Sequence, residues 1–185
     1  MDAFEAILSR HSITKVNSDP VPRKIIEKLL LAAVQAPNHY QVRPWCFVVL
    51  TGKSREALGE VMAQSLSQQH PDLMDAALEK ERAKPLRAPV LIAVGVEKSV
   101  DPRVLETENI CSVAAAVENL LLAAHAEGLG AMWRTGPAAH DPLVKKFLGF
   151  QPDQELLSFV YIGFPDMTPP VMERPSFEDR TVWMD

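Results

Sequence analysis

Cysteine, basic clusters and long uninterrupted apolar runs are all scarce in this sequence, and each scarcity argues against a class of protein. The two cysteines, Cys46 and Cys111, lie in separate apolar segments, which favours buried thiols over a disulfide or a metal pair. No Cys-x-x-Cys or His-x-x-x-His spacing is present, so we predict no metal site. The formal net charge is -5 and no run of four Lys or Arg residues occurs, so we expect no nucleic-acid partner.

Two further features bear on location. The longest apolar region, Ile110 to Ala126, carries Glu118 and Asn119 near its middle, which favours a buried helix over a membrane span. The N-terminal residues lack a basic start followed by an apolar run, so we see no signal peptide. We therefore expect a cytoplasmic protein with no membrane partner.

The length of 185 residues and the hydrophobic content of 47% are typical of one compact domain, residues 1–185. Apolar periodicity predicts helices over residues 2–9, 22–35, 54–67, 72–84, 106–127 and 142–148, with Ser54 as the N-cap of the third. Short apolar runs predict strands over residues 46–50, 89–96, 130–136 and 156–163. Helices and strands do not alternate strictly, which indicates an α+β or three-layer α/β fold.

Three stretches leave alternatives open. The helix predicted over 106–127 is apolar nearly all round, so either a sheet and helices of the same chain or a second subunit must cover it. Residues 68–88 form either a solvated surface or a cover over a pocket. The tail, residues 166–185, is proline-rich yet contains Met172, Phe177, Val182 and Trp183, so we expect it to pack as an arm against an apolar surface, such as that of another chain.

Two polar stretches could bind a ligand. Ala36 to Trp45 reads Ala-Pro-Asn-His-Tyr-Gln-Val-Arg-Pro-Trp and connects a predicted helix to a predicted strand. Binding residues often lie on such connections, although a structural connector with solvated polar groups fits equally well. Arg10-His11-Ser12 ends the first predicted helix, where a guanidinium and a hydroxyl can hold a phosphate or simply face water.

Familiar catalytic motifs are missing. The sequence contains no Gly-x-Ser-x-Gly elbow, no Gly-x-Gly-x-x-Gly after a strand and no phosphate-binding loop ending in Gly-Lys-Ser/Thr. His70, His125 and His140 stand in no pattern that points to a site. We therefore predict no catalytic side chain, and we expect any chemistry to come from a bound organic cofactor.

Three stretches together resemble the FMN-dependent nitroreductase family, in particular its small bacterial members. They are Arg10-His11-Ser12, Ala36-Pro37 with Pro44-Trp45, and Gly128-Leu-Gly-Ala-Met-Trp-Arg-Thr135. The resemblance extends over almost the whole chain in order and spacing. It implies a three-layer α/β/α fold with a central, mostly antiparallel sheet flanked by helices, and a homodimer with two FMN sites at the subunit interface.

The resemblance also implies roles for individual residues. Arg10 and Ser12 would hold the FMN phosphate and ribityl chain, with His11 alongside. Gln35 and His39 would contact the flavin from the partner subunit, and Trp133, Arg134 and Thr135 would complete the cradle. For three of these residues a structural role remains open: Arg134 as an ion-pair partner, His39 as a donor that orders its loop, and Trp133 as a core residue.

The sequence departs from the family pattern at three places. The second motif often reads Ala-Pro-Ser-Ser-Gly-Asn-x-Gln-Pro-Trp, and here His39, Gln41 and Arg43 replace its Ser, Asn and Gln. Many members carry a cation two residues after the serine of the first motif, near the flavin N1 and O2 atoms. Here that position is Thr14, and Lys15 follows it, so either residue could face this edge of the flavin. Of the C-terminal basic cluster, Arg174 and Arg180 remain as stand-ins at the phosphate.

The activity that the resemblance implies is transfer of electrons from NADH or NADPH through FMN to a nitroaromatic, a quinone or a similar small acceptor, with ping-pong kinetics. Two other interpretations remain open because of the altered second motif. One is an FMN-binding protein with little turnover. The other is a flavoenzyme of the same fold that performs ene reduction or dehalogenation.

Overall fold

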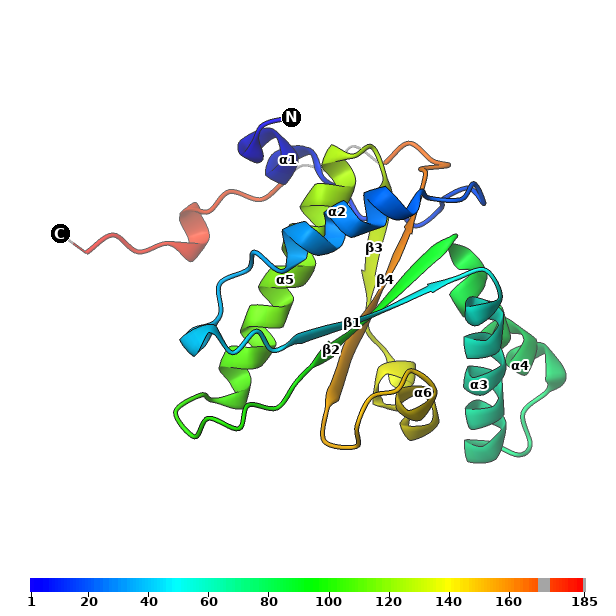
Figure 1. The fold of residues 1–185 in the computed structure, drawn as a ribbon. Helices are drawn as coiled ribbons and strands as arrows, with labels where there is room; N and C mark the ends of the chain where they lie inside the picture. Colours follow the sequence, from blue (N-terminus) through cyan, green and yellow to red (C-terminus); the bar gives the residue numbers. More distant parts are fainter. Residues whose placement is uncertain (170–173, 185) are drawn as a thin grey trace.

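The computed structural model describes residues 1–169 and 174–184 and contains a four-stranded sheet between two layers of helices (Figure 1). The strands are β1 (Trp45–Thr51), β2 (Val90–Val96), β3 (Gly130–Arg134) and β4 (Glu155–Gly163), in the order β1-β2-β4-β3. Each neighbouring pair is antiparallel. The predicted α+β class with an antiparallel sheet is therefore confirmed.

The predicted helices are present, with ends that differ by a few residues. They are α1 (Ala3–Ser9), α2 (Arg23–Ala33), α3 (Lys53–Gln69), α4 (Asp75–Arg82), α5 (Glu106–Ala126) and α6 (Pro142–Phe147). The N-cap predicted for α3 is wrong, because Gly52 occupies that position. The Ser54 hydroxyl instead donates to the Thr51 carbonyl oxygen at 2.7 Å and accepts from the Thr51 N–H at 3.0 Å.

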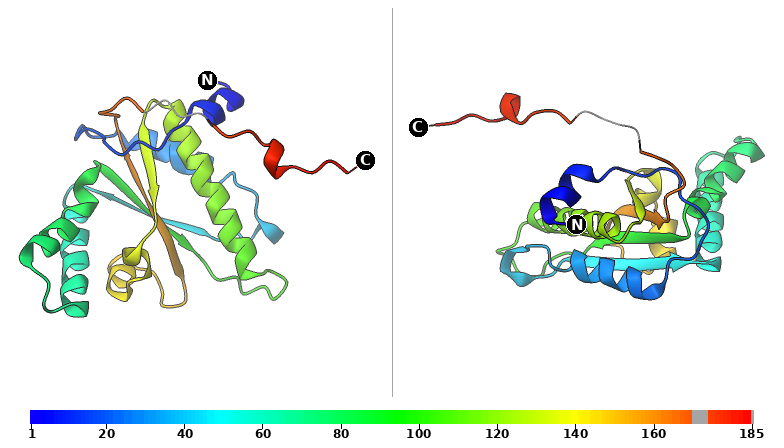
Figure 2. Two further views of the ribbon diagram at one scale, coloured as in Figure 1. Left: turned by 180° about the vertical axis from the view of Figure 1, so that it is seen from behind. Right: turned by 90° about the horizontal axis from the view of Figure 1, so that it is seen from above.

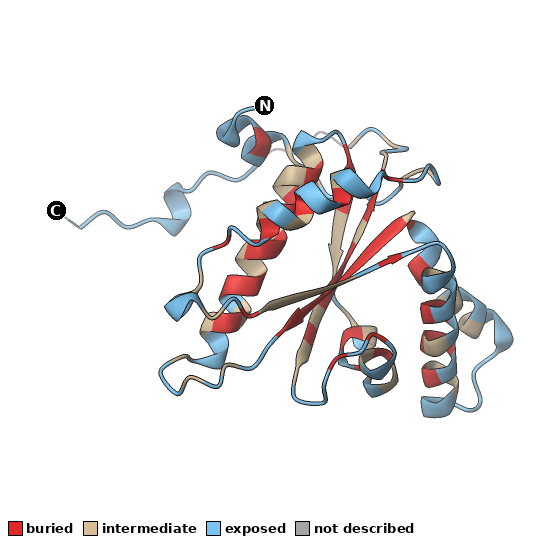
Figure 3. Cartoon of the chain, viewed as in Figure 1, coloured by how far each residue is buried: buried red, intermediate tan, exposed pale blue. Residues whose placement is uncertain are grey.

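The sheet buries both faces, and alternation along the strands divides the core in two. On one face, Ile92 and Val160 pack with α2 and α5; on the other, Leu91 and Phe159 pack with α3 and α6. Figure 3 shows that β2 is buried along its whole length and that α5 is buried along much of its length. Successive residues of one strand therefore reach different layers of the molecule.

Helix α5 supplies much of the first core. Val113, Val117 and Leu120 are fully buried, and the Asn119 side chain donates to the Ala32 carbonyl oxygen of α2 at 3.2 Å. By length and composition α5 could cross a membrane, but its buried residues pack against α2 and the sheet. A stripe at helical spacing stays exposed or half-buried, comprising Thr107, Cys111, Ala114, Glu118 and Leu122. The chain thus covers most of α5, although not all of it.

The segment after Ser12 lies along the edge of the sheet. The Ile13 N–H donates to the Ala131 carbonyl oxygen at 3.0 Å, and Val16 forms a bridge with Pro165. A Cβ atom on Gly130 would lie 2.7 Å from Ile13 Cγ2, so a larger residue there would displace the segment. Glycine at this position lets the segment that follows the first motif approach β3 closely.

The loop before β1 has an unusual backbone. Tyr40, Gln41 and Arg43 have φ values of 48°, 55° and 53°, in the left-handed region that costs a non-glycine residue about 1–2 kcal/mol. The Arg43 N–H donates to Asn38 Oδ1 at 2.8 Å, and the Val42 N–H donates to the His39 carbonyl oxygen at 3.2 Å. Such strain persists only where surrounding contacts fix the backbone.

Beyond Arg174, which contacts Arg10, the described end of the C-terminal tail runs clear of the rest of the chain (Figure 1; Figure 2). Phe177, Val182 and Trp183 are 64%, 85% and 79% exposed. Met172, the fourth apolar residue that we expected to anchor this arm, lies outside the described residues. The described anchors thus have little contact within their own chain.

Candidate functional site

Arg10, His11 and Ser12 follow α1 and lie near α5. Arg10 Nε is 3.3 Å from Glu118 Oε1, but without hydrogen-bond geometry, and this buried N–H has no partner among the described residues. Ser9 Oγ lies 2.7 Å from His125 Nε2, and His11 Nδ1 lies 2.7 Å from the Ser9 carbonyl oxygen. Two imidazoles and a guanidinium therefore gather beside the first motif.

His125 belongs to this cluster although its sequence context gave no reason to select it. Burial lowers its pKa, and the nearby charges of Arg10 and His11 act in the same direction. The direction favours a neutral imidazole, and because the Ser9 hydroxyl donates to the Glu5 carbonyl oxygen at 2.6 Å, the His125 Nε2–H donates to Ser9 Oγ. Sequence patterns could not indicate this contact, because Ser9 and His125 are 116 residues apart and only the fold brings them together.

Trp133 and Arg134 point to opposite faces of the sheet. Trp133 packs against the core formed with α2 and α5, and its buried indole N–H has no hydrogen-bond partner among the described residues. Arg134 is opposite Phe159 on β4, and its guanidinium carbon lies 5.6 Å from the ring centre of Tyr161. The side chains that the third motif was expected to bring into one cradle are thus divided by the sheet.

Arg134 and Thr135 line a cavity of about 150 Å³, which we call the Tyr161 cavity. Its other polar walls come from Lys84 and Arg87, which precede β2, and from Tyr161 itself. Lys84 forms an ion pair with Glu81. These two cations come from residues 68–88, so part of that segment lines a cavity beside the third motif.

Neither Thr14 nor Lys15 lines the Tyr161 cavity. The Thr14 hydroxyl contacts Met167 Sδ at 3.3 Å, and Lys15 Nζ pairs with Asp166 Oδ2 at 2.6 Å. Both residues face the turn that follows β4. Lys84 was not among the predicted site residues, because no sequence motif links it to Thr135 and only the fold brings the two to one cavity.

Gln35 and His39 lie apart from the first motif within one chain. The Gln35 side chain donates to the Leu31 carbonyl oxygen at 3.2 Å, and His39 Nδ1 lies 2.9 Å from Glu108 Oε2. Glu108 and Glu118, the contacts of His39 and Arg10, are ten residues apart on α5, which corresponds to a rise of about 15 Å. Within one chain, the α5 contacts of Arg10 and His39 are thus separated by nearly three helical turns.

His39 is held by more than one neighbour. Its ring stacks on Tyr40 with centres 4.3 Å apart, and the Arg103 guanidinium carbon lies 4.2 Å from the Tyr40 ring centre. The hydrogen bond from His39 lowers the pKa of Glu108. These contacts fix the strained loop and leave the imidazole about half exposed.

Of the two C-terminal arginines, Arg174 lies at the first motif. Its guanidinium donates to the Arg10 carbonyl oxygen. Arg180 instead approaches Asp179 at 3.3 Å, with its side chain 84% exposed. Arg174 is therefore positioned to add charge beside Arg10.

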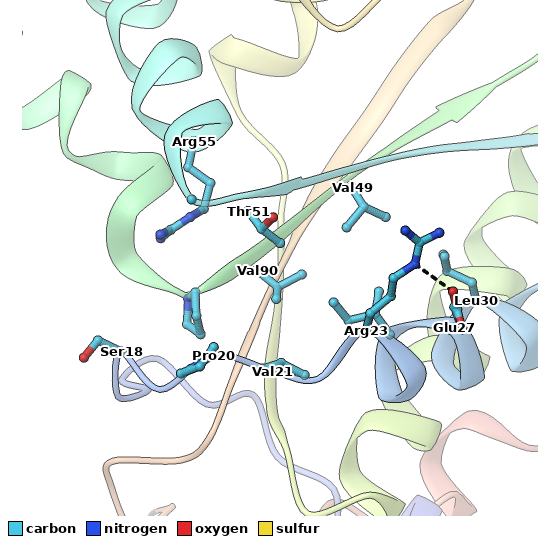
Figure 4. A pocket seen from close by; sticks show the side chains of 13 residues that line it. Ser18, Pro20, Val21, Arg23, Glu27, Leu30, Val49, Thr51, Arg55 and Val90 are labelled. Carbon is cyan, nitrogen blue, oxygen red and sulfur yellow. Dashed lines mark hydrogen bonds and ion pairs between the residues drawn. The ribbon is translucent and has the colours of Figure 1, made fainter.

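A cavity of about 640 Å³ lies between α2 and the edge strand β1 (Figure 4). Its walls include Val49, Thr51 and Arg55 on one side and Arg23 and Leu30 on the other. None of the eight predicted cofactor-binding residues lines it. Its volume alone therefore gives no support to a role in cofactor binding.

Comparison with known proteins gives one consistent result. The family model described as "Nitroreductase family" matches residues 7–164. The putative NAD(P)H nitroreductase YdjA of Escherichia coli strain K12 is 32% identical over 168 residues, or 90% of each chain.

Solved structures agree in fold. The crystal structure of a nitroreductase-like family protein from Bacillus cereus superposes with a TM-score of 0.85 at 24% identity, covering 100% of this chain and 96% of the other. The FMN and NADPH-dependent nitroreductase NfnB from Sphigopyxis sp. strain HMH superposes with a TM-score of 0.81 at 18% identity, covering 100% of each chain.

Proposed function

Because this chain belongs to the nitroreductase family, we propose that it is an NAD(P)H-dependent oxidoreductase that binds FMN and reduces a nitroaromatic, a quinone or a related small acceptor. Bound FMN would supply the redox chemistry, accepting hydride from NADH or NADPH and passing electrons to the acceptor. The use of one pocket by both substrates in turn predicts ping-pong kinetics. We expect the protein to act in the cytoplasm.

The observation that carries this proposal is the pair of buried, unpartnered donors at Arg10 Nε and Trp133 Nε1. Buried polar groups normally have partners, so these N–H groups fit a ligand rich in acceptors. FMN is such a ligand, with phosphate oxygens at one end and ring carbonyls at the other. The residues present therefore fit the cofactor that the family suggests.

The phosphate end would lie at the first motif. Arg10, His11 and Ser12 would hold the phosphate and ribityl chain, and Arg174 would add charge from the C-terminal side. His125 would position Ser9, and through it the start of the motif. These roles need no proton transfer by any of the side chains.

The ring end would lie at the end of β3. Trp133, Thr135 and the main chain of Arg134 would border the flavin ring and its carbonyl edge. A well-placed donor there would stabilise developing negative charge by roughly 3–4 kcal/mol. The Arg134 guanidinium would remain available on the other face of the sheet.

The remaining contacts would come from a second subunit. Gln35 and His39 would reach the flavin of the partner, as in the family resemblance, and the separation of about 15 Å between the α5 contacts of His39 and Arg10 is compatible with this. The stripe on α5 would pack against the partner in a homodimer, and the arm of residues 166–185 would extend over it. The exposed Phe177 and Trp183 support this arrangement.

A second candidate is an FMN-binding protein with little turnover, or a family member with different chemistry such as ene reduction or dehalogenation. The loop before β1 supports this second candidate, because the residues that depart from the family pattern are held there in a particular arrangement. His39 is paired with Glu108, and Gln41 and Arg43 have left-handed backbones. Fast reduction of bound flavin by NADH or NADPH, without turnover of any acceptor, would favour the binder. Product analysis would identify a different reaction.

The test of the main proposal is an absorbance spectrum of the purified protein, with a mass measurement of the released chromophore. We expect a yellow protein that releases FMN and bleaches when NADH or NADPH is added under nitrogen. A colourless protein that cannot be reconstituted with FMN would contradict the proposal.

A further inference from the structure

Three cationic side chains, Lys84, Arg87 and Arg134, line the Tyr161 cavity. Of the three cations that line it, Lys84 is paired with Glu81. Arg87 and Arg134 have no carboxylate within 4.0 Å in the part of the chain that the structure describes. Two arginines thus line one small space without an ion-pair partner of their own among the described residues.

Tyr161 adds a hydrogen-bond donor to the same space. Burial raises the pKa of Tyr161, the charges of Arg87 and Arg134 lower it, and the charge of Glu81 adds to the rise. The net shift is upward, so the phenol keeps its proton at neutral pH. The side chains around the cavity that lack an acidic partner are therefore donors, which is the chemistry of an oxyanion site.

A second cavity, of about 310 Å³, adjoins the first and shares Met62, Lys84, Pro137 and Ala138 with it. Leu66 and Val144 add apolar walls, and Gln69 and His140 add polar ones. Its two carboxylates already have partners: Glu81 pairs with Lys84, and Asp141 accepts from the Ser65 hydroxyl and from the Leu143 and Val144 N–H groups. An apolar body in this second cavity would place a charged end group near the two guanidiniums. The combination fits a small aromatic anion better than an isolated inorganic ion.

We propose that Arg87 and Arg134 form an oxyanion subsite that selects acceptors carrying a carboxylate on an aromatic ring. The planar guanidinium matches a carboxylate in a two-bond geometry, and Tyr161 donates a further bond. The identity of the ligand as an acceptor rests on the proposed function, whereas the anion site rests on the cavity alone. A phosphate of the reductant has related chemistry and is the competing source.

The test uses the purified protein and unreactive probes in titration calorimetry. Benzoate is compared with benzamide, its neutral analogue, and both are compared with inorganic phosphate and adenosine 2′,5′-bisphosphate. The variants are Arg87→Ala and Arg87→Lys, because Arg87 has no part in the proposed cofactor cradle. Arg82→Ala is the matched control, since Arg82 belongs to the same segment, residues 68–88, but pairs with Glu60 and Glu79.

We expect benzoate to bind and benzamide to bind much more weakly. Arg87→Ala should weaken benzoate roughly 10-fold or more, as expected for loss of a charged hydrogen bond, and Arg87→Lys should restore part of the affinity. Benzamide binding, FMN content and the Arg82→Ala control should not change. A parallel increase in KM for 4-nitrobenzoate, but not for 4-nitrobenzamide, would support the assignment.

Three results would overturn the inference. They are equal affinity for benzoate and benzamide, unchanged benzoate affinity in Arg87→Ala, and binding of the bisphosphate or inorganic phosphate in place of benzoate. The FMN content of the purified protein tests the proposed function, whereas the benzoate titration tests the anion site and requires no flavin. The two failures can therefore be distinguished.

Discussion

Replacing Arg10 with alanine tests the phosphate end of the proposed site. The Arg10 side chain is 20% exposed, and its buried Nε has no hydrogen-bond partner within the described chain. A charged hydrogen bond to phosphate contributes roughly 1.5–3 kcal/mol, so Arg10→Ala should weaken FMN binding about 10- to 100-fold. The free energy of unfolding of the flavin-free protein should change little, because the approach to Glu118 lacks hydrogen-bond geometry and partly exposed ion pairs contribute about 0–1 kcal/mol.

The assay is a titration of flavin-free protein with FMN, followed by flavin fluorescence, together with thermal unfolding of each variant. Arg23→Ala is the control, since Arg23 forms an exposed pair with Glu27 on α2, away from the first motif. Unchanged FMN affinity in Arg10→Ala would refute the phosphate assignment. A large loss of stability in the flavin-free variant would refute the argument that Arg10 is held for a ligand.

Three further predictions concern stability and ionisation. Gly130→Ala would place a Cβ atom 2.7 Å from Ile13 Cγ2, so denaturant unfolding should show a loss of about 1–3 kcal/mol and FMN titration a lower affinity; no change in either would contradict the packing argument. Hydrogen bonds from Arg103 lower the pKa of Asp101 to about 2, so this pair stabilises the fold above the ordinary carboxyl pKa and the stabilisation is lost as pH falls towards 2. Carboxyl NMR should show that low titration midpoint, which Arg103→Gln should raise; an ordinary midpoint in the unmodified protein would contradict it. Burial raises the pKa of Cys46 to about 11, so iodoacetamide at pH 8 should leave this thiol unmodified in the native protein, and rapid alkylation seen by mass spectrometry would contradict the prediction.

Local sequence patterns predicted most of the fold because the apolar periods of its elements are strong. The one-sided stripe of α2 and the continuous apolar run of β2 each allow one assignment, and the structure confirms both. The N-cap of α3 was wrong because a serine near a helix start can bond the preceding turn, as Ser54 does with Thr51. Such a choice depends on backbone geometry that sequence pattern does not specify.

The candidate site was less predictable from the sequence than the fold. The first motif was recognisable from adjacent residues, whereas its neighbours His125 and Arg174 are brought there by the fold. The side chains of Trp133 and Arg134 were expected together, although strand alternation sends them to opposite faces. The left-handed backbone at Tyr40 was not predictable, because non-glycine residues adopt it only where tertiary contacts compensate.

The central claim is that one flavin site takes Arg10 from one chain and His39 from another, and subunit mixing tests it most directly. Arg10→Ala homodimers and Gln35→Ala/His39→Ala homodimers should each bind FMN poorly. After unfolding and refolding together, random pairing should restore about a quarter of the sites to full affinity, because each mixed dimer contains one site with no substitution. If both residues served a site within one chain, mixing would restore none, and that result would contradict the account.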